Sequence, residues 1–297
     1  MVSRQLVAIG VAVLGAFSTP LQAQSLAAPD MGKLLATGGV SQLEGAGGGG
    51  LTPWALISGY GTRDSFGGNV HGTLVATQDY QLNSFGLALG LADRVELSLA
   101  RQNFRGTGAA LDQVTIGQDI VGVKVRVVGD AVIDQDSMLP QIALGAMIKR
   151  NTGVGGLAGV NSVKQLGAAS ENGVDYYIAA TKILLSQSLL LNGTLRATKA
   201  NQLGLLGFGG DLHDRYRPML ELSAAYLATR KLALGLEYRM KPHNLTIDNE
   251  KDYYDAFVAY FPTKNVSLTA AYAVLGDITI LNPTRQKGAY LSLQVGF

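Results

Sequence analysis

The chain has 297 residues, of which 47% are hydrophobic and 15% are charged, and its formal net charge is +2. The 24 Lys and Arg residues nearly balance the 22 Asp and Glu residues, so no basic surplus indicates nucleic acid as a partner. The sequence contains no cysteine, which excludes a disulfide framework and a thiolate metal site.

The first residues predict a secretory signal peptide. Arg4 precedes an apolar run at residues 6–17, and the segment ends in the small residue Ala23. The apolar run is shorter than the roughly 20 residues that a spanning helix needs, and polar sequence follows it. Cleavage is therefore expected after Ala23, with residues 1–23 as the signal peptide.

Residues 24–53 show neither a helix period nor a strand period and are rich in glycine. The run from Gly45 to Gly50 contains five glycines and one alanine. Such a segment has two interpretations: a flexible periplasmic leader, or a plug folded back into the lumen of a barrel. Because the segment has few side chains that could hold a fixed position, the pattern favours the leader.

Strand patterns begin at Trp54. Residues 54–61 are predicted as the first strand, and residues 70–91 as one long or bulged strand. From Phe85 to Leu91, large apolar residues alternate with glycine and alanine, and a short link at 92–94 leads into the next alternating segment. This pattern predicts a β-hairpin with a tight turn.

The same hairpin unit recurs to the end of the chain. Residues 232–240 show the cleanest period of two, whereas residues 177–185 alternate poorly, so the facing of that strand is left open. Short turns tend to alternate with long loops at residues 151–173, 201–216, 241–252 and 276–286. The further strands are predicted at residues 95–99, 121–127, 142–149, 177–185, 189–198, 220–226, 232–240, 254–260, 266–274 and 287–297.

These features predict an all-β fold: a transmembrane, antiparallel, up-and-down β-barrel of about twelve strands, at residues 54–297. The mean hydropathy is positive although no spanning helix is predicted, as is typical of barrels whose strands touch lipid with every second residue. In outer-membrane barrels the short turns are periplasmic and the long loops extracellular. The expected location is the cell outer membrane, after cleavage of the signal peptide, with lipid and lipopolysaccharide as surroundings.

Aromatic residues near the predicted strand ends indicate an interfacial girdle. The residues concerned are Trp54, Tyr60, Tyr80, Phe104, Tyr177, Tyr216, Tyr254, Tyr260 and Phe297.

The last strand, residues 287–297, has one apolar and one polar face and ends on Phe297, which lies on the apolar face. An alternating strand that closes on an aromatic residue resembles the C-terminal signal of bacterial outer-membrane barrels. The resemblance implies recognition by the barrel-assembly machinery, with Tyr290 and Phe297 as the signal residues.

A wider resemblance covers nearly the whole mature chain. Residues Gly32 to Thr62, Asp112 to Asp130 and Leu139 to Asn151 are similar to the domain-of-unknown-function 3034 family of Gram-negative proteins. The resemblance implies an outer-membrane barrel with no assigned substrate. It also makes the glycine-rich segment a family feature, which strengthens the plug interpretation.

The residues of catalytic chemistry are few. The three histidines, His71, His213 and His243, lie in no nucleophile motif, and the glycine runs lack the lysine of a phosphate loop. His213 lies between Asp211 and Asp214 in a long loop, where solvated polar residues are usual. We therefore expect no enzyme activity, no cofactor and no metal.

Charged residues on the inward face remain as the candidate site. They cannot face lipid without a large cost, so they either line a pore that selects solutes or form salt bridges that fill a closed lumen. The first interpretation predicts a passive channel for small polar or anionic solutes, because basic residues outnumber acidic ones. The second predicts a structural barrel that binds an envelope partner through its loops. The predicted lumen-lining residues are Glu96, Lys124, Arg126, Lys149, Lys182, Arg196, Glu221, Glu237, Arg239, Lys241 and Asp255.

Overall fold

The structure is a computed structural model and describes residue 33, residues 39–108 and residues 111–297. The predicted signal peptide, residues 1–23, lies outside the described residues. None of the helices in the described residues is long and apolar enough to cross a membrane.

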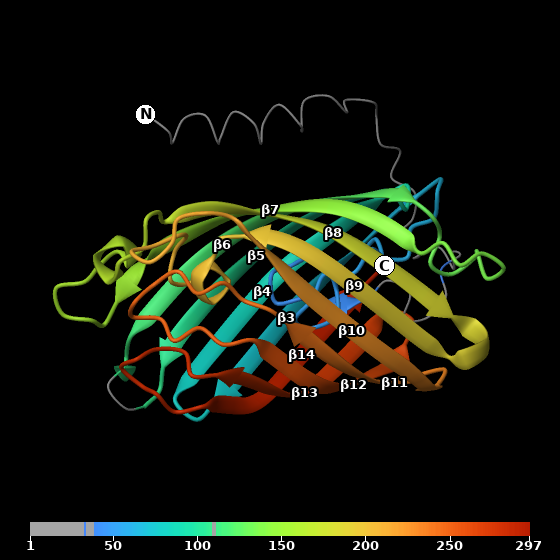
Figure 1. The fold of residues 1–297 in the computed structure, drawn as a ribbon. Helices are drawn as coiled ribbons and strands as arrows, with labels where there is room; N and C mark the ends of the chain where they lie inside the picture. The colour runs from blue at the N-terminus through green and yellow to red at the C-terminus, as the bar shows by residue number, and fades with distance from the viewer. Residues whose placement is uncertain (1–32, 34–38, 109–110) are drawn as a thin grey trace, which may run out of the picture. The chain divides into compact units, whose positions relative to one another are not determined.

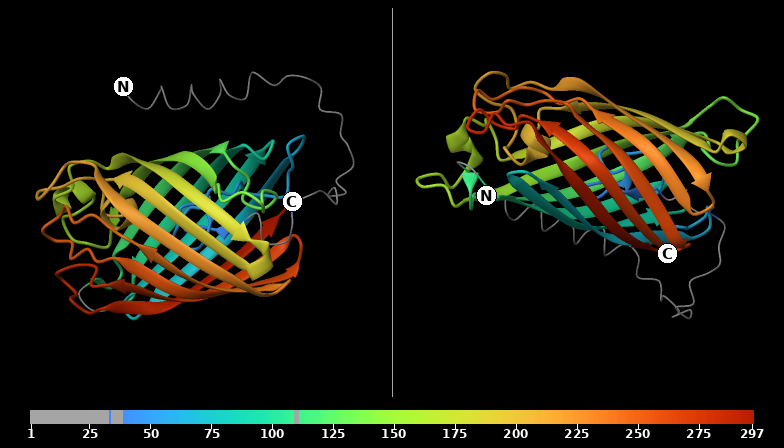
Figure 2. Two further views of the ribbon diagram at one scale, coloured as in Figure 1. Left: turned by 45° about the vertical axis from the view of Figure 1, so that its right-hand side comes forward. Right: turned by 90° about the horizontal axis from the view of Figure 1, so that it is seen from below.

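Twelve antiparallel strands form a closed barrel, in which each strand pairs with the next and the last pairs with the first (Figures 1 and 2). This confirms the predicted fold class and strand number. The strands are β3 (Phe66–Thr77), β4 (Tyr80–Leu91), β5 (Val95–Gly106), β6 (Thr115–Val128), β7 (Gln141–Gly155), β8 (Asn172–Leu184), β9 (Leu189–Thr198), β10 (Arg217–Thr229), β11 (Leu232–Arg239), β12 (Tyr253–Thr263), β13 (Val266–Gly276) and β14 (Gln286–Gly296).

The C-terminal strand closes the barrel. β14 pairs with β3 from Gly288 opposite Thr77 to Gly296 opposite Asn69. The Phe297 amide donates to the Gly68 carbonyl at 2.9 Å, and the Phe297 carbonyl accepts from the Gly68 amide at 2.9 Å. Closure leaves no unpaired strand edge, which a barrel in lipid requires because the hydrocarbon offers no hydrogen-bond partners.

Two strand predictions at the start of the chain are wrong. One predicted strand is absent and another is in fact two strands, so the total number is unchanged. Residues 54–61 form no wall strand, and residues 70–91 are the two strands β3 and β4 with a turn at Gln78 and Asp79. That turn contains no glycine or asparagine, the residues that usually mark a tight hairpin. The wall therefore begins at Phe66, not at Trp54.

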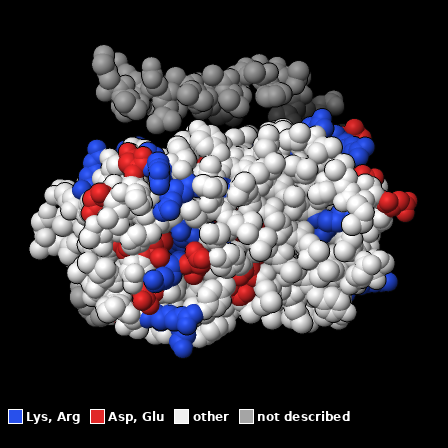
Figure 3. Space-filling model, viewed as in Figure 1, with Lys and Arg blue, Asp and Glu red and all other residues white. Residues whose placement is uncertain are grey.

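The outer face of the barrel is apolar. On β6, for example, Val121, Val123, Val125 and Val127 are all exposed. Figure 3 shows a broad area without charge over the strands, with charged side chains towards both ends of the barrel. An apolar belt of this extent fits the hydrocarbon of a membrane.

The long connections gather at one end of the barrel, the loop end, and C-terminal Phe297 lies at the other, the turn end (Figure 1). Short helices occur in the connections: η2 (Val163–Leu166), η3 (Leu185–Gln187) and η4 (Asn201–Gly204). One connection at the turn end, residues 129–140, is also long.

The predicted aromatic girdle is partly wrong. Trp54, Tyr80 and Tyr177 are buried inside the barrel. Trp54 and Tyr177 pack in apolar clusters, and Tyr80 packs against the ring of Phe104. The exposed members of the predicted set are Tyr216, Tyr254, Tyr260 and Phe297.

A charge in the apolar belt should destabilise the barrel. Leu97 and Asn103 lie on the same outer face of β5. Leu97 pairs with the apolar residues Leu89 and Val123, whereas Asn103 pairs with Asn83 and Gly117 nearer the loop end. We expect Leu97→Arg to lower the free energy of unfolding by about 2–4 kcal/mol, and Asn103→Arg by less than about 1 kcal/mol. Urea unfolding in lipid vesicles measures both, and equal costs would contradict this placement of the belt.

Candidate functional site

A folded segment occupies the lumen. We call residues 39–61 the plug. Tyr60 is half-buried, and every other plug residue whose burial the structure describes is buried. It has internal structure, with a two-stranded sheet of β1 (Val40–Ser41) and β2 (Gly47–Gly48) and a bond of 3.0 Å from the Leu43 amide to the Gly50 carbonyl. For residues 39–53 the prediction of a flexible leader is therefore wrong, whereas residues 24–32 and 34–38 lie outside the described residues.

Glycine is required in the plug because other chain segments approach its backbone closely. A Cβ atom at Gly48 would collide with the Thr52 carbonyl, and one at Gly49 would collide with the Glu237 carboxylate on β11. The glycine run that resembles a flexible linker thus permits close packing.

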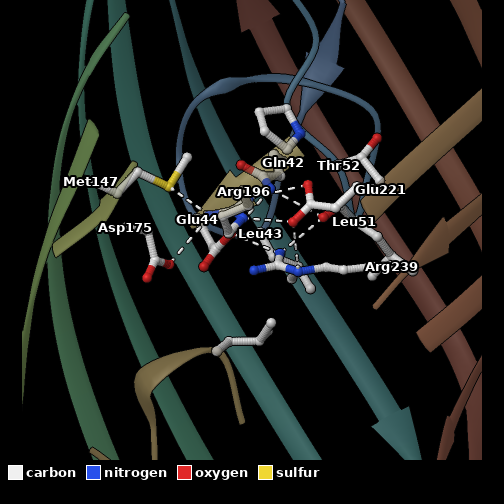
Figure 4. A network of polar contacts seen from close by, with 12 residues as sticks. Gln42, Leu43, Glu44, Leu51, Thr52, Met147, Asp175, Arg196, Glu221 and Arg239 are labelled. Carbon is white, nitrogen blue, oxygen red and sulfur yellow. Dashed lines mark hydrogen bonds and ion pairs between the residues drawn. The ribbon is translucent and has the colours of Figure 1, made fainter. Parts of the chain in front are cut away.

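The side chain of Glu44 is the centre of a buried ion network (Figure 4). Its carboxylate forms an ion pair with Lys149 on β7, lies 3.3 Å from Arg196 on β9 and accepts from Arg239 on β11 at 2.7 Å. Burial on its own would raise the pKa of the Glu44 carboxyl, but the three cations outweigh burial and hold this pKa well below its ordinary value.

Two wall carboxylates complete this network. Asp175 on β8 lies 2.6 Å from the Lys149 ammonium and 3.3 Å from the Arg196 guanidinium. Glu221 on β10 lies 2.6 Å from Arg196 and 3.3 Å from Arg239. Three cations therefore face three carboxylates, one of which the plug supplies. We call these six residues the Glu44 network.

A second ion pair forms hydrogen bonds with the backbone of the plug. Lys124 and Glu96 are 3.0 Å apart and both are buried. The Lys124 ammonium donates to the carbonyls of Gly47 and Leu56 at 2.9 and 2.7 Å. The Glu96 carboxylate accepts from the amides of Gly47 and Ser58 at 2.9 and 2.8 Å. This pair therefore binds the plug to the wall at two places in its sequence, at Gly47 and at residues 56–58.

Glu237 holds the plug through hydrogen bonds. Its carboxylate accepts from the Leu51 amide and the Thr52 hydroxyl, both at 2.7 Å. Thr52 also hydrogen-bonds Ser223 on β10, and the Trp54 indole donates to the same Ser223 hydroxyl at 3.0 Å.

A loop covers the plug from the loop end. The Leu203 carbonyl accepts from Lys149 at 3.0 Å and from Gln118 at 3.3 Å. Gln202 and Leu203 have φ values of 44° and 66°, which are uncommon for residues with a side chain. The side-chain nitrogen of Gln202 donates to the Asp248 carboxyl at 2.7 Å. Burial of Asp248, together with the nearby Glu250 carboxylate, raises the pKa of Asp248 to about 10.

Comparison with known proteins places this plugged barrel in a family. The family model described as "Protein of unknown function (DUF3034)" matches residues 37–294. The chain belongs to this family. No curated protein matches the sequence.

A solved porin shares the fold of the DUF3034 barrel. The NanC porin has 10% sequence identity and a TM-score of 0.52, over 77% of this chain and 98% of that chain. The KdgM porin has 11% identity and a TM-score of 0.46, over 78% and 99%. An outer membrane channel from Pseudomonas putida F1 has 14% identity and a TM-score of 0.45, over 78% and 95%. At such identities the likeness to the NanC porin shows the fold alone.

Ten of the eleven predicted lumen residues of the DUF3034 barrel have their side chains inside it. Arg126 lies near the turn end, 2.8 Å from Asp93 and 3.4 Å from Asp130, and Lys241 forms an ion pair with Glu250 near the loop end. The ten are Glu96, Lys124, Arg126, Lys149, Arg196, Glu221, Glu237, Arg239, Lys241 and Asp255.

The prediction for Lys182 is wrong. Lys182 pairs with the exposed Leu191 and shares the outer face of β8 with Ile178. It is buried because the connection at residues 129–140 covers it, and its ammonium donates to the Asp134 carbonyl.

Asp175 is absent from the prediction for two reasons: it lies before the predicted strand at residues 177–185, and Lys182 is predicted to lie on the inner face of that strand. A shift of one residue moves every side chain of a strand to the other face, and the weak alternation of residues 177–185 left that choice open. The signal that was available is the spacing of Asp175, Tyr177, Ala179 and Thr181, which are all buried.

Small inward residues make room for the plug rather than for solute. Ala46 and Ala55 of the plug pack in one cluster with Ala143 and Ala179 of the wall. In a second cluster Trp54 and Leu56 pack with the residues Ala225, Ala233, Phe257 and Ala259.

The predicted assembly residues lie on opposite faces of the barrel wall. Tyr290 is buried on the inner face of β14, near Gly50 of the plug, and Phe297 is exposed. Their recognition by the assembly machinery stays a prediction.

The histidines do not converge. His71 lies on the inner face of β3, 2.9 Å from Asn69, and His213 and His243 lie in connections at the loop end. Within residues 39–108 and 111–297, no group of three or more histidine and acidic side chains is arranged to hold a metal.

Removal of the Glu44 charge should destabilise the protein. Glu44→Gln leaves three buried cations with two carboxylates, and breaking a buried network in this way costs about 3–5 kcal/mol. Urea unfolding measures the loss, and adding Lys149→Met should recover part of it by restoring the balance of charge.

The matched control is the pair of Lys199 and Asp214 in the connection between β9 and β10, whose atoms approach to 2.6 Å. Asp214→Asn should cost less than about 1 kcal/mol because solvent at the loop end screens this pair. A Glu44→Gln variant as stable as Asp214→Asn would show that the plug does not depend on the network.

Proposed function

We propose that the protein is an outer-membrane channel that the plug closes, and that solutes pass when the plug leaves the inner wall. The observation that carries this proposal is the way in which the plug is held. Ion pairs, hydrogen bonds and apolar contacts hold residues 39–61, and none of the strand pairs of the barrel wall includes them. The plug can therefore move without opening a strand edge.

The chemistry of the contacts supports a gate. Replacing a buried ion pair by apolar residues of similar volume is often neutral or stabilising. A segment that served only to fill the barrel would need no charge. The Glu44 network instead leaves polar groups on the wall that water would solvate once the plug moved away.

The expected anion preference does not follow from this inner wall. The predicted inner wall has seven basic and four acidic side chains. Because Lys182 lies outside the lumen and Asp175 lies inside it, the corrected set has six basic and five acidic side chains. A nearly balanced wall favours small polar solutes without strong charge selection.

A second candidate is a structural barrel that binds an envelope partner. The favouring observation is that two segments, the plug and the loop around Leu203, both close the lumen in this conformation. Such a protein would conduct under no condition.

A disulfide between the plug and the wall separates the two candidates. The hydroxyls of Thr52 and Ser223 are in direct contact, so cysteines at both positions place two sulfurs within bonding reach, and the sequence has no other cysteine. We expect Thr52→Cys/Ser223→Cys to conduct in planar bilayers when reduced and to lose that conductance when oxidised.

The matched control links two wall strands without touching the plug. Thr73 on β3 and Ser292 on β14 are opposite each other, with their hydroxyls 2.8 Å apart. Oxidised Thr73→Cys/Ser292→Cys should conduct like the reduced protein. Equal conductance of the plug variant in both states would overturn the gate, and no conductance in any state would favour the structural barrel.

A further inference from the structure

An apolar cavity of 110 Å³ lies inside the barrel at the loop end. Leu43 of the plug and Leu203 of the covering loop both line it. One wall comes from the inner faces of β3 to β6, and the rest from β7, β12, β13 and the loop-end connections. The side chains that define the cavity include Val75, Leu82, Phe104, Val114, Ile116 and Leu205.

The lining of this cavity differs from the middle of the lumen. None of its described lining residues is charged, whereas the adjacent Glu44 network consists of charged side chains only. Water in a cavity needs two to four polar partners. The cavity therefore has the surface of a site for an apolar molecule.

Most polar side chains at the edge of the cavity are already engaged. The Gln202 carboxamide oxygen accepts from Lys241 at 2.7 Å and also from the Tyr253 hydroxyl, and its nitrogen donates to Asp248. The Thr279 hydroxyl donates to the Ile247 carbonyl at 3.0 Å. The exception is the buried Tyr80 hydroxyl, which has no hydrogen-bond partner among the described residues. The engaged groups would not compete for a ligand, which shape and apolar contact would select.

We propose that this cavity binds a small apolar molecule, of the size and chemistry of a single aromatic ring. A cavity of about 150 Å³ lined by Leu, Ile and Phe stays dry and binds benzene, and the present cavity has a similar lining and a comparable volume. Tyr80 and Phe104 line it with their ring centroids 5.3 Å apart, within the range of roughly 4.5–7 Å at which aromatic rings attract one another, so a third ring in the cavity would meet an aromatic surface.

The site goes beyond the proposed gate and does not depend on it. The connections that line it lie at the loop end, so a ligand reaches it without crossing the plug. Because Leu43 and Leu203 form part of the lining, the ligand contacts both segments that close the lumen. Binding would therefore stabilise the closed conformation.

The test uses the full mature chain in detergent and toluene as the probe. We expect the melting temperature to rise with toluene concentration, and crystals soaked in iodobenzene to show the iodine in the cavity. Val114→Phe fills the cavity, and Val114→Thr keeps its shape but adds a hydroxyl. Both variants should lose the toluene-dependent rise, and the Thr variant guards against a loss that overpacking alone would cause.

Val121→Phe is the matched control, because Val121 is exposed on the lipid-facing side of β6. It should keep the full toluene response. Iodine found only on the outer face, a detergent chain in the cavity, or an equal toluene response in Val114→Phe would each overturn the proposal. Since no step requires conductance, a barrel that binds toluene but never conducts would refute the gate and leave this site standing.

Discussion

The structure depends on one constraint: a charge that is removed from water must be paired. Lys149, Arg196 and Arg239 point into a barrel that is too crowded to hydrate them, and the wall offers them only Asp175 and Glu221. Glu44 supplies the third carboxylate. In the closed conformation the plug is therefore needed for charge balance, because three buried cations with only the two wall carboxylates would leave one charge without a counter-ion. This requirement explains why a segment so rich in glycine has one defined position.

Shape and charge act together in the lumen. Small wall residues such as Ala143 and Ala233 leave the space that the plug fills, and the glycines of the plug let its backbone approach the wall closely enough for Lys124 and Glu96 to bond it directly. Ion pairs add little net stability when they are buried, but leaving one partner unpaired is costly, so an arrangement that pairs every charge is favoured over one that does not. A plug held in this way has a unique closed position and, once it is displaced, leaves a wall that water can solvate.

The interior thus has two regions with different chemistry. The middle carries the Glu44 network, and the loop end carries an apolar cavity that Leu43 and Leu203 help to line. The family and the shared porin fold establish the architecture. The proposed gate and the proposed apolar site rest on the described contacts of this chain, and they concern different regions, so each can hold without the other.

The sequence by itself determined the features that alternate with a period of two. Side chains on strands such as β11 and β14 had to face either lipid or the interior, and so the barrel, most of its strands and ten of its inward charges could be predicted. Tertiary structure decided what local pattern does not encode. The facing of β8 depended on its neighbours, which placed Asp175 inside and Lys182 outside. The plug could not be predicted because Glu44 meets partners that are more than 100 residues away in sequence, and a glycine run has the same local appearance whether it is packed against a wall or free in solvent.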